Sequence, residues 1–321
     1  MPINEPVISI LLLTYMHEEF VREALDSIFT QELSVGFEVI ATEDCSSDRT
    51  RIILEEYRQR FPETLFILQR DARVGGKRNL LDGFARCRGN FVCVLDGDDY
   101  WTDTHKLSAQ LAILQESSQY VACAHNTRAL VVRDNALSYD IVDPERVKEH
   151  YSLSDLIEGR IYLHSSSLLF RNVFKGALPE AQAHPRAGDY FMSMLFAEHG
   201  NIAFIDRVMS VYRMTGLGAW STLDPLAQRM RNIDGLVVYN KLLRYRYATL
   251  FDSRIYREVR KLVPAIKGHG QGKLRALCKY LFLRFAYRPF KRKGTMELRP
   301  LFARLADALW FSDVPSDPRL H

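Results

Sequence analysis

The chain has 321 residues, of which 43 are Lys or Arg and 39 are Asp or Glu, so its net charge is +4. No apolar run reaches the roughly 20 residues that span a bilayer, and the N-terminal segment MPINEPVISI lacks the basic region and cleavage site of a signal peptide. Five scattered cysteines without a CxxC pair favour reduced thiols over a disulfide framework or a zinc site. These features predict a cytoplasmic protein with one large α/β domain and an extension.

Strand-like and helix-like segments alternate from the N-terminus. Residues 7–13 (VISILLL) form a short run of branched apolar residues, which is typical of a strand buried on both faces. Apolar residues then recur at helical spacing over 20–29. The alternation continues with predicted strands at 37–41, 65–68 and 91–95, and with predicted helices at 50–57, 77–87 and 105–115. This order predicts a doubly wound, mostly parallel sheet with helices on both faces.

Polar clusters follow three of the predicted strands, and in doubly wound sheets ligands bind beyond the carboxyl ends of the strands. Thr14 and Tyr15 follow the first strand, and Asp44 follows the second. The stretch VLDGDDYW (94–101) places three carboxylates directly after the fourth strand. Hard cations such as Mg²⁺ and Mn²⁺ prefer oxygen ligands and commonly use one or two carboxylates plus substrate phosphates. The alternative is a solvated acidic turn ahead of the next helix, but the position at a strand end favours a metal and diphosphate site.

Five blocks of sequence carry a family resemblance. In chain order they are SILLLTYMHEEFVREALDSIFTQ, FEVIATEDCSSDRT, RVGGKRNLLDGFARCRGNFVCVLDGDDYWTDTHKL, HSSSLLFR and AGDYFMSMLFAEHGNIAFIDRVMSVYR. Together they resemble the family 2 inverting glycosyltransferases, which have the GT-A fold, over about residues 5–222. The resemblance implies a catalytic domain at 1–222, with a nucleotide-sugar-binding half at 1–100 and an acceptor-side half at 101–222.

The resemblance also implies roles on the donor side. Asp44 matches the family aspartate that contacts the nucleotide base, and a carboxylate can accept the imide N–H of uracil or thymine. Thr14 and Tyr15 would flank that base. The alternative for Asp44 is capping of the following helix, which Ser46, Ser47 or Asp48 can do equally well.

The metal and diphosphate residues follow from the same match. Asp98 and Asp99 resemble the pair that contacts ribose and metal, with Asp96 in support, and the implied cofactor is Mg²⁺ or Mn²⁺. Arg78 resembles a basic residue near the diphosphate, although a solvated arginine on a helix face fits the sequence nearly as well.

On the acceptor side, Asp189 matches the general base that removes the acceptor hydroxyl proton. The alternative is an N-cap for a helix over 190–198. His164 either orients the acceptor or is a satisfied core histidine. Arg213 and the loop MTGLGAWS (214–221) resemble a glycine-hinged lid, in which Trp220 stacks on a sugar or anchors the loop.

Two departures from the family pattern concern the base contact: Met16 stands where many relatives have Asn, and Glu43 where many have Asp. No Gln-x-x-Arg-Trp motif follows Trp220, and membrane spans are absent, which favours addition of a single sugar. The expected donor is a nucleoside-diphosphate sugar, with UDP or dTDP favoured. The expected acceptor is a glycan or lipid-linked glycan in cell-surface polysaccharide assembly, such as O-antigen or capsule. The alternatives are a sugar-phosphate nucleotidyltransferase, which usually has a Gly-rich basic loop where this chain has TYMHEE, and a non-catalytic nucleotide-sugar-binding module.

Charge separates the C-terminal region from the rest. Residues 241–300 contain 17 Lys or Arg and three acids, a balance of +14, which leaves −10 for the remainder of the chain. We expect residues 223–321 to form a helical basic extension. The segment LCKYLFLRFAYRPFKRK (277–293) predicts either an amphipathic helix on an anionic membrane, which would make the protein peripheral on the inner face of the membrane, or a cap packed on the catalytic domain. No nucleic-acid-binding module accompanies the basic residues, so nucleic acid is not an expected partner.

Overall fold

The computed structural model describes residues 6–131, 138–143, 145, 147–215 and 223–267, and the chain divides into two compact units, residues 1–222 and 223–321. Among the described helices none is long and apolar enough to cross a membrane. The strands of the first unit are β1 (Ile8–Thr14), β2 (Phe37–Glu43), β3 (Leu65–Gln69), β4 (Phe91–Asp96), β5 (Tyr100–Trp101), β6 (Tyr120–Val131), β7 (Ser138–Asp140), β8 (His150–Tyr151), β9 (Leu169–Arg171) and β10 (Asn201–Met214).

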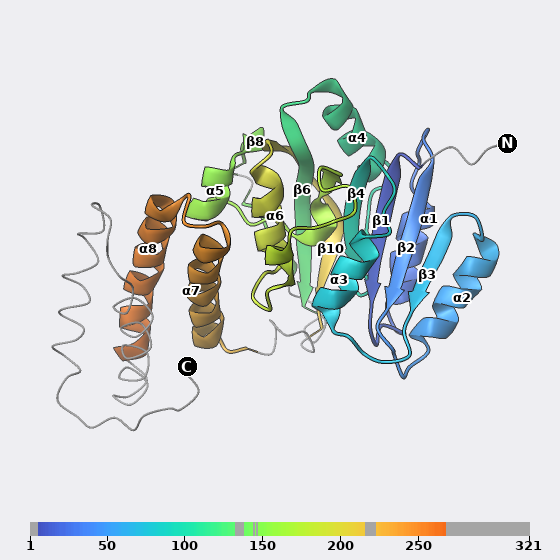
Figure 1. Ribbon diagram of the computed structural model, residues 1–321, viewed down its shortest axis with the longest axis horizontal. Coiled ribbons are helices and arrows are strands. Elements are labelled where there is room, and N and C mark those ends of the chain that lie inside the picture. Colours follow the sequence, from blue (N-terminus) through green and yellow to red (C-terminus); the bar gives the residue numbers. More distant parts are fainter. Residues whose placement is uncertain (1–5, 132–137, 144, 146, 216–222, 268–321) are drawn as a thin grey trace. The chain divides into compact units, whose positions relative to one another are not determined.

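These strands form a single mixed sheet in the order β3-β2-β1-β4-β9-β6-β10-β5, with β7 paired to β6 and β8 paired to β10. The long pairings are parallel: β1 with β2 and β4, β2 with β3, and β6 with β10. The antiparallel pairings extend over only two or three residue pairs each. The chain runs outward from β1 to β3 and then returns to β4 on the other side of β1, so the strand order reverses between β1 and β4 (Figure 1).

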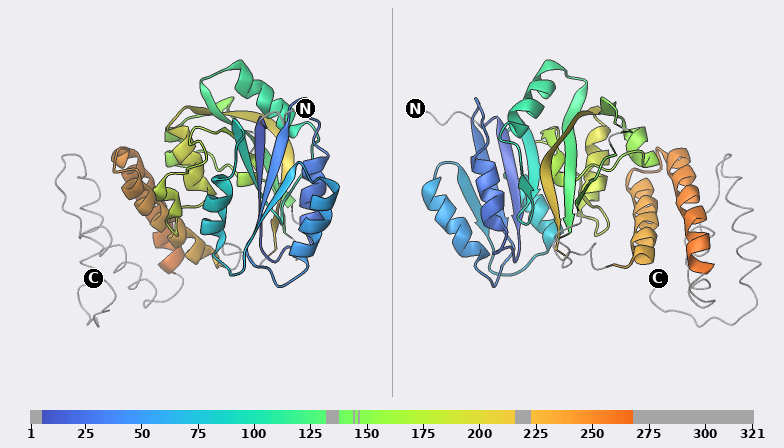
Figure 2. Two further views of the ribbon diagram at one scale, coloured as in Figure 1. Left: turned by 45° about the vertical axis from the view of Figure 1, so that its right-hand side comes forward. Right: turned by 180° about the vertical axis from the view of Figure 1, so that it is seen from behind.

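Helices cover both faces of the sheet, which confirms the predicted fold class (Figure 2). The helical elements of the first unit are α1 (Val21–Phe29), α2 (Thr50–Arg60), α3 (Gly76–Phe84), α4 (Lys106–Glu116), α5 (Leu153–Glu158), α6 (Asp189–Ala197) and the short 3₁₀ turns η2 (Ser165–Ser167) and η3 (Glu180–Ala183). Helices α1, α2 and α4 share one core with alternate residues of β1, because successive side chains of a strand point to opposite faces. Helix α3 packs on the opposite face of β1 and β2.

Close packing of α3 depends on a glycine. A Cβ on Gly83 would lie 2.5 Å from Leu11 Cδ1 and 2.6 Å from Thr42 Cγ2, so no larger side chain fits without movement. The last turn of α3 therefore lies directly on the strands that precede the polar clusters. This contact holds α3 close against β1 and β2.

The described part of the second unit consists of α7 (Pro225–Leu242) and α8 (Ala248–Lys267), which contact each other. Asp224 caps α7 through hydrogen bonds from the backbone N–H groups of Leu226 and Ala227, and Pro225 occupies the first helical position. The helical character expected for the extension is therefore confirmed over 225–242 and 248–267. The segment 277–293 lies outside the described residues.

Candidate active site

The three polar clusters meet at one edge of the sheet. In the parallel registers Thr14 lies opposite Glu43, and Leu13 lies opposite Asp96. The carboxyl ends of β1, β2 and β4 are thus level with one another beside the point where the strand order reverses. The strand pairing therefore produces a ligand position where the sequence predicts one.

Asp44 anchors the loop that leads into α3. Its carboxylate is 2% exposed and accepts the backbone N–H groups of Val74 (2.8 Å) and Gly75 (2.9 Å). It does not cap α2, because Asp48 accepts the Thr50 N–H at 3.0 Å instead. The capping alternative for Asp44 is therefore excluded, and the carboxylate lies at the strand end.

Tyr15 lies beside Asp44, whereas Thr14 is turned inward. The Arg73 guanidinium lies 3.9 Å from the centroid of the Tyr15 ring, and its Nε is 4.0 Å from Asp44. Thr14 is 1% exposed and donates its hydroxyl proton to the Thr42 carbonyl. Arg73 is thus open to solvent and Tyr15 partly so, whereas the buried Thr14 supports the strand end from within.

The turn after β4 is shaped by a glycine. A Cβ on Gly97 would lie 2.7 Å from His17 Nδ1 and 2.9 Å from Thr14 Cγ2, so this position requires glycine. The turn thereby brings Asp98 to 3.9 Å from His17 Nε2, with the Asp98 side chain 25% exposed. The close approach at Gly97 therefore leaves the Asp98 carboxylate partly open to solvent at the strand end.

The pKa of Asp96 is strongly raised. Burial raises its pKa, the charges of Asp98 and Asp189 raise it further, and the result is about 7, although a hydrogen bond from Ser165 and the charge of Lys77 act in the opposite direction. Asp189 is distant from Asp96 in the sequence, so this interaction shows that the fold brings the predicted general base to the aspartate turn. A cation that enters the site would stabilise the ionised form of a carboxyl group with such a pKa.

Asp99 is held inside the protein. Its side chain is 1% exposed, one oxygen accepts the Arg213 backbone N–H at 2.9 Å, and the other lies 3.8 Å from His164 Nε2. Burial and the charges of Asp98 and Asp96 raise its pKa well above the ordinary value. Of these two carboxylates, that of Asp98 therefore remains accessible to solvent, whereas the buried carboxylate of Asp99 stabilises the turn.

His164 has the surroundings of a satisfied core histidine. It is 5% exposed, its Nδ1 lies within hydrogen-bond distance of the backbone N–H (3.3 Å) and the hydroxyl (2.8 Å) of Ser166, and its Nε2 faces Asp99 at 3.8 Å. Burial lowers its pKa, so the ring is neutral at neutral pH. This geometry favours the core interpretation over direct contact with an acceptor.

Asp189 is the first residue of α6, one position inside the N-cap Gly188. Its Oδ1 accepts the Tyr190 N–H at 2.9 Å, and its Oδ2 accepts the Tyr162 hydroxyl at 3.0 Å. Asp189 is not the N-cap of this helix, because Gly188 occupies the N-cap position. The carboxylate lies partly exposed at the helix start, where the helix dipole favours negative charge.

The basic residue whose charge acts on the aspartate turn is Lys77, and not Arg78 as the sequence suggested. Arg78 is 66% exposed and pairs with Asp82 at 2.8 Å, one turn along α3. Lys77, its neighbour, is the residue whose charge acts on Asp96. No motif in the sequence points to Tyr162, or to Glu23, which binds the Arg213 guanidinium. Trp220 and the loop 216–222 lie outside the described residues.

The donor set fits a hard divalent cation. Within the described part of the chain, no three or more His, Cys, Asp or Glu side chains gather into a complete ligand set. Mg²⁺ and Mn²⁺ sites of the type expected here use one or two carboxylates and take further oxygens from substrate phosphates and water. Asp98 and Asp96 offer such carboxylates at the strand ends.

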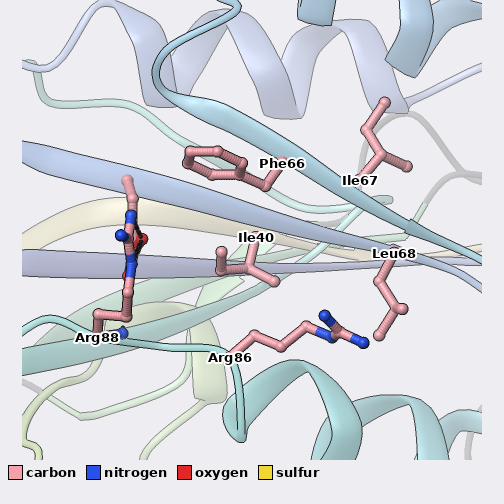
Figure 3. Close-up of a pocket in the computed structure, with 7 residues that line it drawn as sticks. Ile40, Phe66, Ile67, Leu68, Arg86 and Arg88 are labelled. Atoms are coloured by element: carbon pink, nitrogen blue, oxygen red, sulfur yellow. Dashed lines mark hydrogen bonds and ion pairs between the residues drawn. The ribbon is translucent and has the colours of Figure 1, made fainter.

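A separate cavity of about 300 Å³ lies away from these residues. Ile40, Phe66 and Leu68 line it from the sheet, and Arg86 and Arg88 line it from the segment between α3 and β4 (Figure 3). None of the residues predicted for the site belongs to its lining. The strand-end cluster, and not this cavity, is therefore the candidate active site.

The fold and the acidic strand-end site define a GT-A protein, and comparison with known proteins agrees. Residues 9–177 match the family model described as glycosyl transferase family 2. The chain belongs to this family. The uncharacterized protein Rv1520 of Mycobacterium tuberculosis is 30% identical over 212 residues, which are 66% of this chain and 60% of that protein, so the match leaves about two fifths of the relative uncovered.

Two solved structures share the fold. Staphylococcus aureus TarS 1-349 in complex with UDP has a TM-score of 0.67 at 17% identity, covering 94% of this chain and 87% of that one. The mannosyltransferase PcManGT from Pyrobaculum calidifontis, in complex with GDP-Man and Mn²⁺, has a TM-score of 0.56 at 18% identity, covering 97% and 89%.

Proposed function

We propose that this chain is a non-processive, inverting glycosyltransferase that moves one sugar from a nucleoside-diphosphate sugar to an acceptor hydroxyl. The observation that carries the proposal is the acidic turn at the level carboxyl ends of β1, β2 and β4, where the charge of Asp189 contributes to the raised pKa of Asp96. A general base must lie close to the bound diphosphate and its sugar, and these two carboxylates come from segments that only the fold brings together. Membership of glycosyl transferase family 2 supports the same reaction class.

The donor half of the site follows from residues 1–100. Asp44, Tyr15 and Arg73 hold the base, and the carboxylates of Asp96 and Asp98 lie toward ribose and diphosphate. TarS has been solved with UDP and PcManGT with GDP-Man and Mn²⁺, which supports a nucleotide-sugar donor; we propose UDP or dTDP for this chain. A bound Mg²⁺ or Mn²⁺, held by Asp98 with Asp96, would supply electrostatic stabilisation of the leaving diphosphate.

Transfer requires one in-line displacement, for which residues 101–222 supply the acceptor side. The acceptor oxygen bonds to the anomeric carbon as the bond to the diphosphate oxygen breaks, and Asp189 takes the acceptor hydroxyl proton. Lys77 contributes positive charge on the side of Asp96. We propose a glycan or lipid-linked acceptor of a cell-surface polysaccharide, because TarS is named as a poly(ribitol-phosphate) β-N-acetylglucosaminyltransferase and is 28% identical to this chain over 166 residues.

The test is Asp189→Asn, which nearly preserves shape but cannot accept the proton. UDP-GlcNAc, UDP-glucose, dTDP-glucose and GDP-mannose are supplied with Mn²⁺ and a panel of p-nitrophenyl glycosides, and nucleoside diphosphate release and glycoside mass are measured. General-base catalysis typically contributes about 10² to 10⁴ in rate, so we expect a kcat loss of that order with donor affinity within a few-fold of wild type.

Asp155→Asn is the matched control. Asp155 also lies in the first turn of a helix, where it accepts the Ser152 backbone N–H, but it belongs to α5 and has no place in the reaction. We expect it to lower thermal stability without a specific loss of kcat. Full activity of Asp189→Asn, or release of pyrophosphate in place of nucleoside diphosphate, would overturn the proposed function.

A further inference from the structure

Tyr162 holds the carboxylate that we propose as the base. It lies in the segment between α5 and η2, and its hydroxyl donates to Asp189 Oδ2 at 3.0 Å while the Tyr190 backbone N–H donates to Oδ1 at 2.9 Å. Both oxygens are thereby oriented, one from within α6 and one from a separate segment. Because the carboxylate has lone pairs left on each oxygen, these bonds orient it without preventing it from accepting a proton.

The phenol is a donor at neutral pH. Burial of the hydroxyl, followed by the charge of Asp189, raises the pKa of Tyr162 well above its ordinary value. The phenolic proton therefore remains in place, and the bond to the carboxylate is a charge-assisted one, which is stronger than a bond between neutral groups.

Tyr162 is an exposed residue although its hydroxyl is bound. The residue as a whole is 43% exposed, while its hydroxyl is hydrogen-bonded to Asp189. Its ring lies 5.9 Å from the Tyr190 ring, which is itself anchored through a hydroxyl bond to the Leu156 carbonyl. An exposed, immobilised aromatic ring next to the carboxylate is a surface on which an apolar ligand face can pack.

We propose that Tyr162 positions Asp189 for proton removal and that its exposed ring forms the wall of the acceptor subsite, against which a sugar ring of the acceptor packs. This inference rests on the proposed function, since it assigns the acceptor side of that reaction. A pyranose ring presents an apolar face of C–H groups and an edge of hydroxyls. Packed on Tyr162, such a ring would place a hydroxyl at its edge beside Asp189.

A merely structural tyrosine would tether its segment to α6 and nothing more. Its removal would then lower stability and change kcat and KM little. Positioning and packing predict different effects for two substitutions. Tyr162→Phe removes only the bond to Asp189, whereas Tyr162→Leu removes the ring as well.

Both variants are measured with the donor and p-nitrophenyl glycoside that give the fastest wild-type transfer. We expect Tyr162→Phe to lower kcat about tenfold, a part of the contribution of a general base, with acceptor and donor KM within about twofold. Tyr162→Leu should share that kcat and also raise the acceptor KM about fivefold or more, while donor KM stays unchanged. In an Asp189→Asn background Tyr162→Phe should cause no further loss of kcat, because the two residues act as a unit.

Tyr57→Phe is the matched control. Tyr57 also donates its hydroxyl to an aspartate, Asp26, at 2.5 Å, but it joins α2 to α1 within the core on one face of the sheet. This variant should change thermal stability and leave kcat and both KM values as in wild type. Wild-type kcat in Tyr162→Phe would overturn the positioning role, and equal acceptor KM in the Phe and Leu variants would overturn the packing role. Either result with an inactive Asp189→Asn leaves the proposed function standing, whereas an active Asp189→Asn contradicts that function itself.

Discussion

Lys106 is a buried lysine whose ammonium group has no hydrogen-bond partner among the residues that the structure describes. It is the first residue of α4, fully buried, and its Nζ has no hydrogen bond to any described residue. The ammonium group makes a cation–π contact with the Trp101 ring, whose centroid is 4.2 Å away. Burial raises the pKa of the neighbouring Cys93 and Cys123 thiols to about 11 and about 12, so neither supplies a negative charge at neutral pH.

This arrangement should cost stability. Burial lowers the pKa of Lys106 from 10.5 to about 8. A difference of that size between the unfolded and folded states corresponds to about 3 kcal/mol, of which the Trp101 ring recovers roughly 1–2 kcal/mol through a desolvated cation–π interaction. Lys106→Met has similar length and keeps a sulfur–aromatic contact. We therefore expect it to raise the free energy of unfolding by about 1–2 kcal/mol at pH 7.

The gain should depend on pH with a defined sign. Below pH 8 the lysine is charged in both states, and the cost of burial is complete. Between pH 8 and 10.5 the folded state releases its proton before the unfolded state does, so the unfolded state binds more protons and wild-type stability rises with pH. The advantage of Lys106→Met should shrink over this interval.

Urea unfolding followed by tryptophan fluorescence at pH 7 and pH 10 measures both effects. Lys175→Met is the control, since Lys175 is exposed and a surface substitution of this kind usually changes stability by less than about 0.5 kcal/mol. A Lys106→Met protein that is less stable than wild type at pH 7, or that keeps the same advantage at pH 10, would refute the reasoning and point to an undetected partner for the ammonium group.

Two further predictions concern the metal and the basic segment. Asp98→Asn should abolish the thermal stabilisation that UDP gives in the presence of Mn²⁺ while the melting temperature without ligand stays within a few degrees, and equal Mn²⁺-dependent stabilisation in variant and wild type would exclude Asp98 as a ligand. Residues 241–300, with their balance of +14, should favour anionic over neutral liposomes in flotation at low salt, with about 1 kcal/mol per engaged Lys or Arg and less binding at high salt; equal recovery with both lipids would favour a packed cap.

The sequence predicts the sheet well because its strands are short apolar runs that can occupy only buried positions. The strands predicted at 7–13, 37–41, 65–68 and 91–95 agree closely with the bounds of β1, β2, β3 and β4. The meeting of the polar clusters is predictable as well, since residues that come directly after parallel strands lie at the same edge of the sheet. The mixed half of the sheet is harder to predict, because β5, β8 and β9 have only two or three residues and leave no periodicity to read.

Side-chain direction is the part of the site that the sequence leaves undetermined. Arg78 and Lys77 are adjacent, and each step along a helix turns the side chain by about 100°, so a shift of one residue in the helix start exchanges their roles. The predicted helix begins at 77, whereas α3 begins at Gly76. Tyr162 belongs to no motif, and its bond to Asp189 spans 27 residues, so no local pattern reveals it.

Arg213, near the end of β10, joins this strand to the aspartate turn after β4 and to α1. Its side chain is 9% exposed, and its guanidinium binds the Asp98 carbonyl at 2.8 Å and the carboxylate of Glu23, 190 residues away. The backbone N–H of the same residue holds Asp99, and the Tyr100 ring lies 4.4 Å from the guanidinium. The planar fork of the guanidinium presents its donors to both acceptors in a fixed geometry, which the compact ammonium group of a Lys would not reproduce. The end of β10 therefore holds the aspartate turn that follows β4, and we expect a change at Arg213 to disturb the geometry of Asp98 and Asp99.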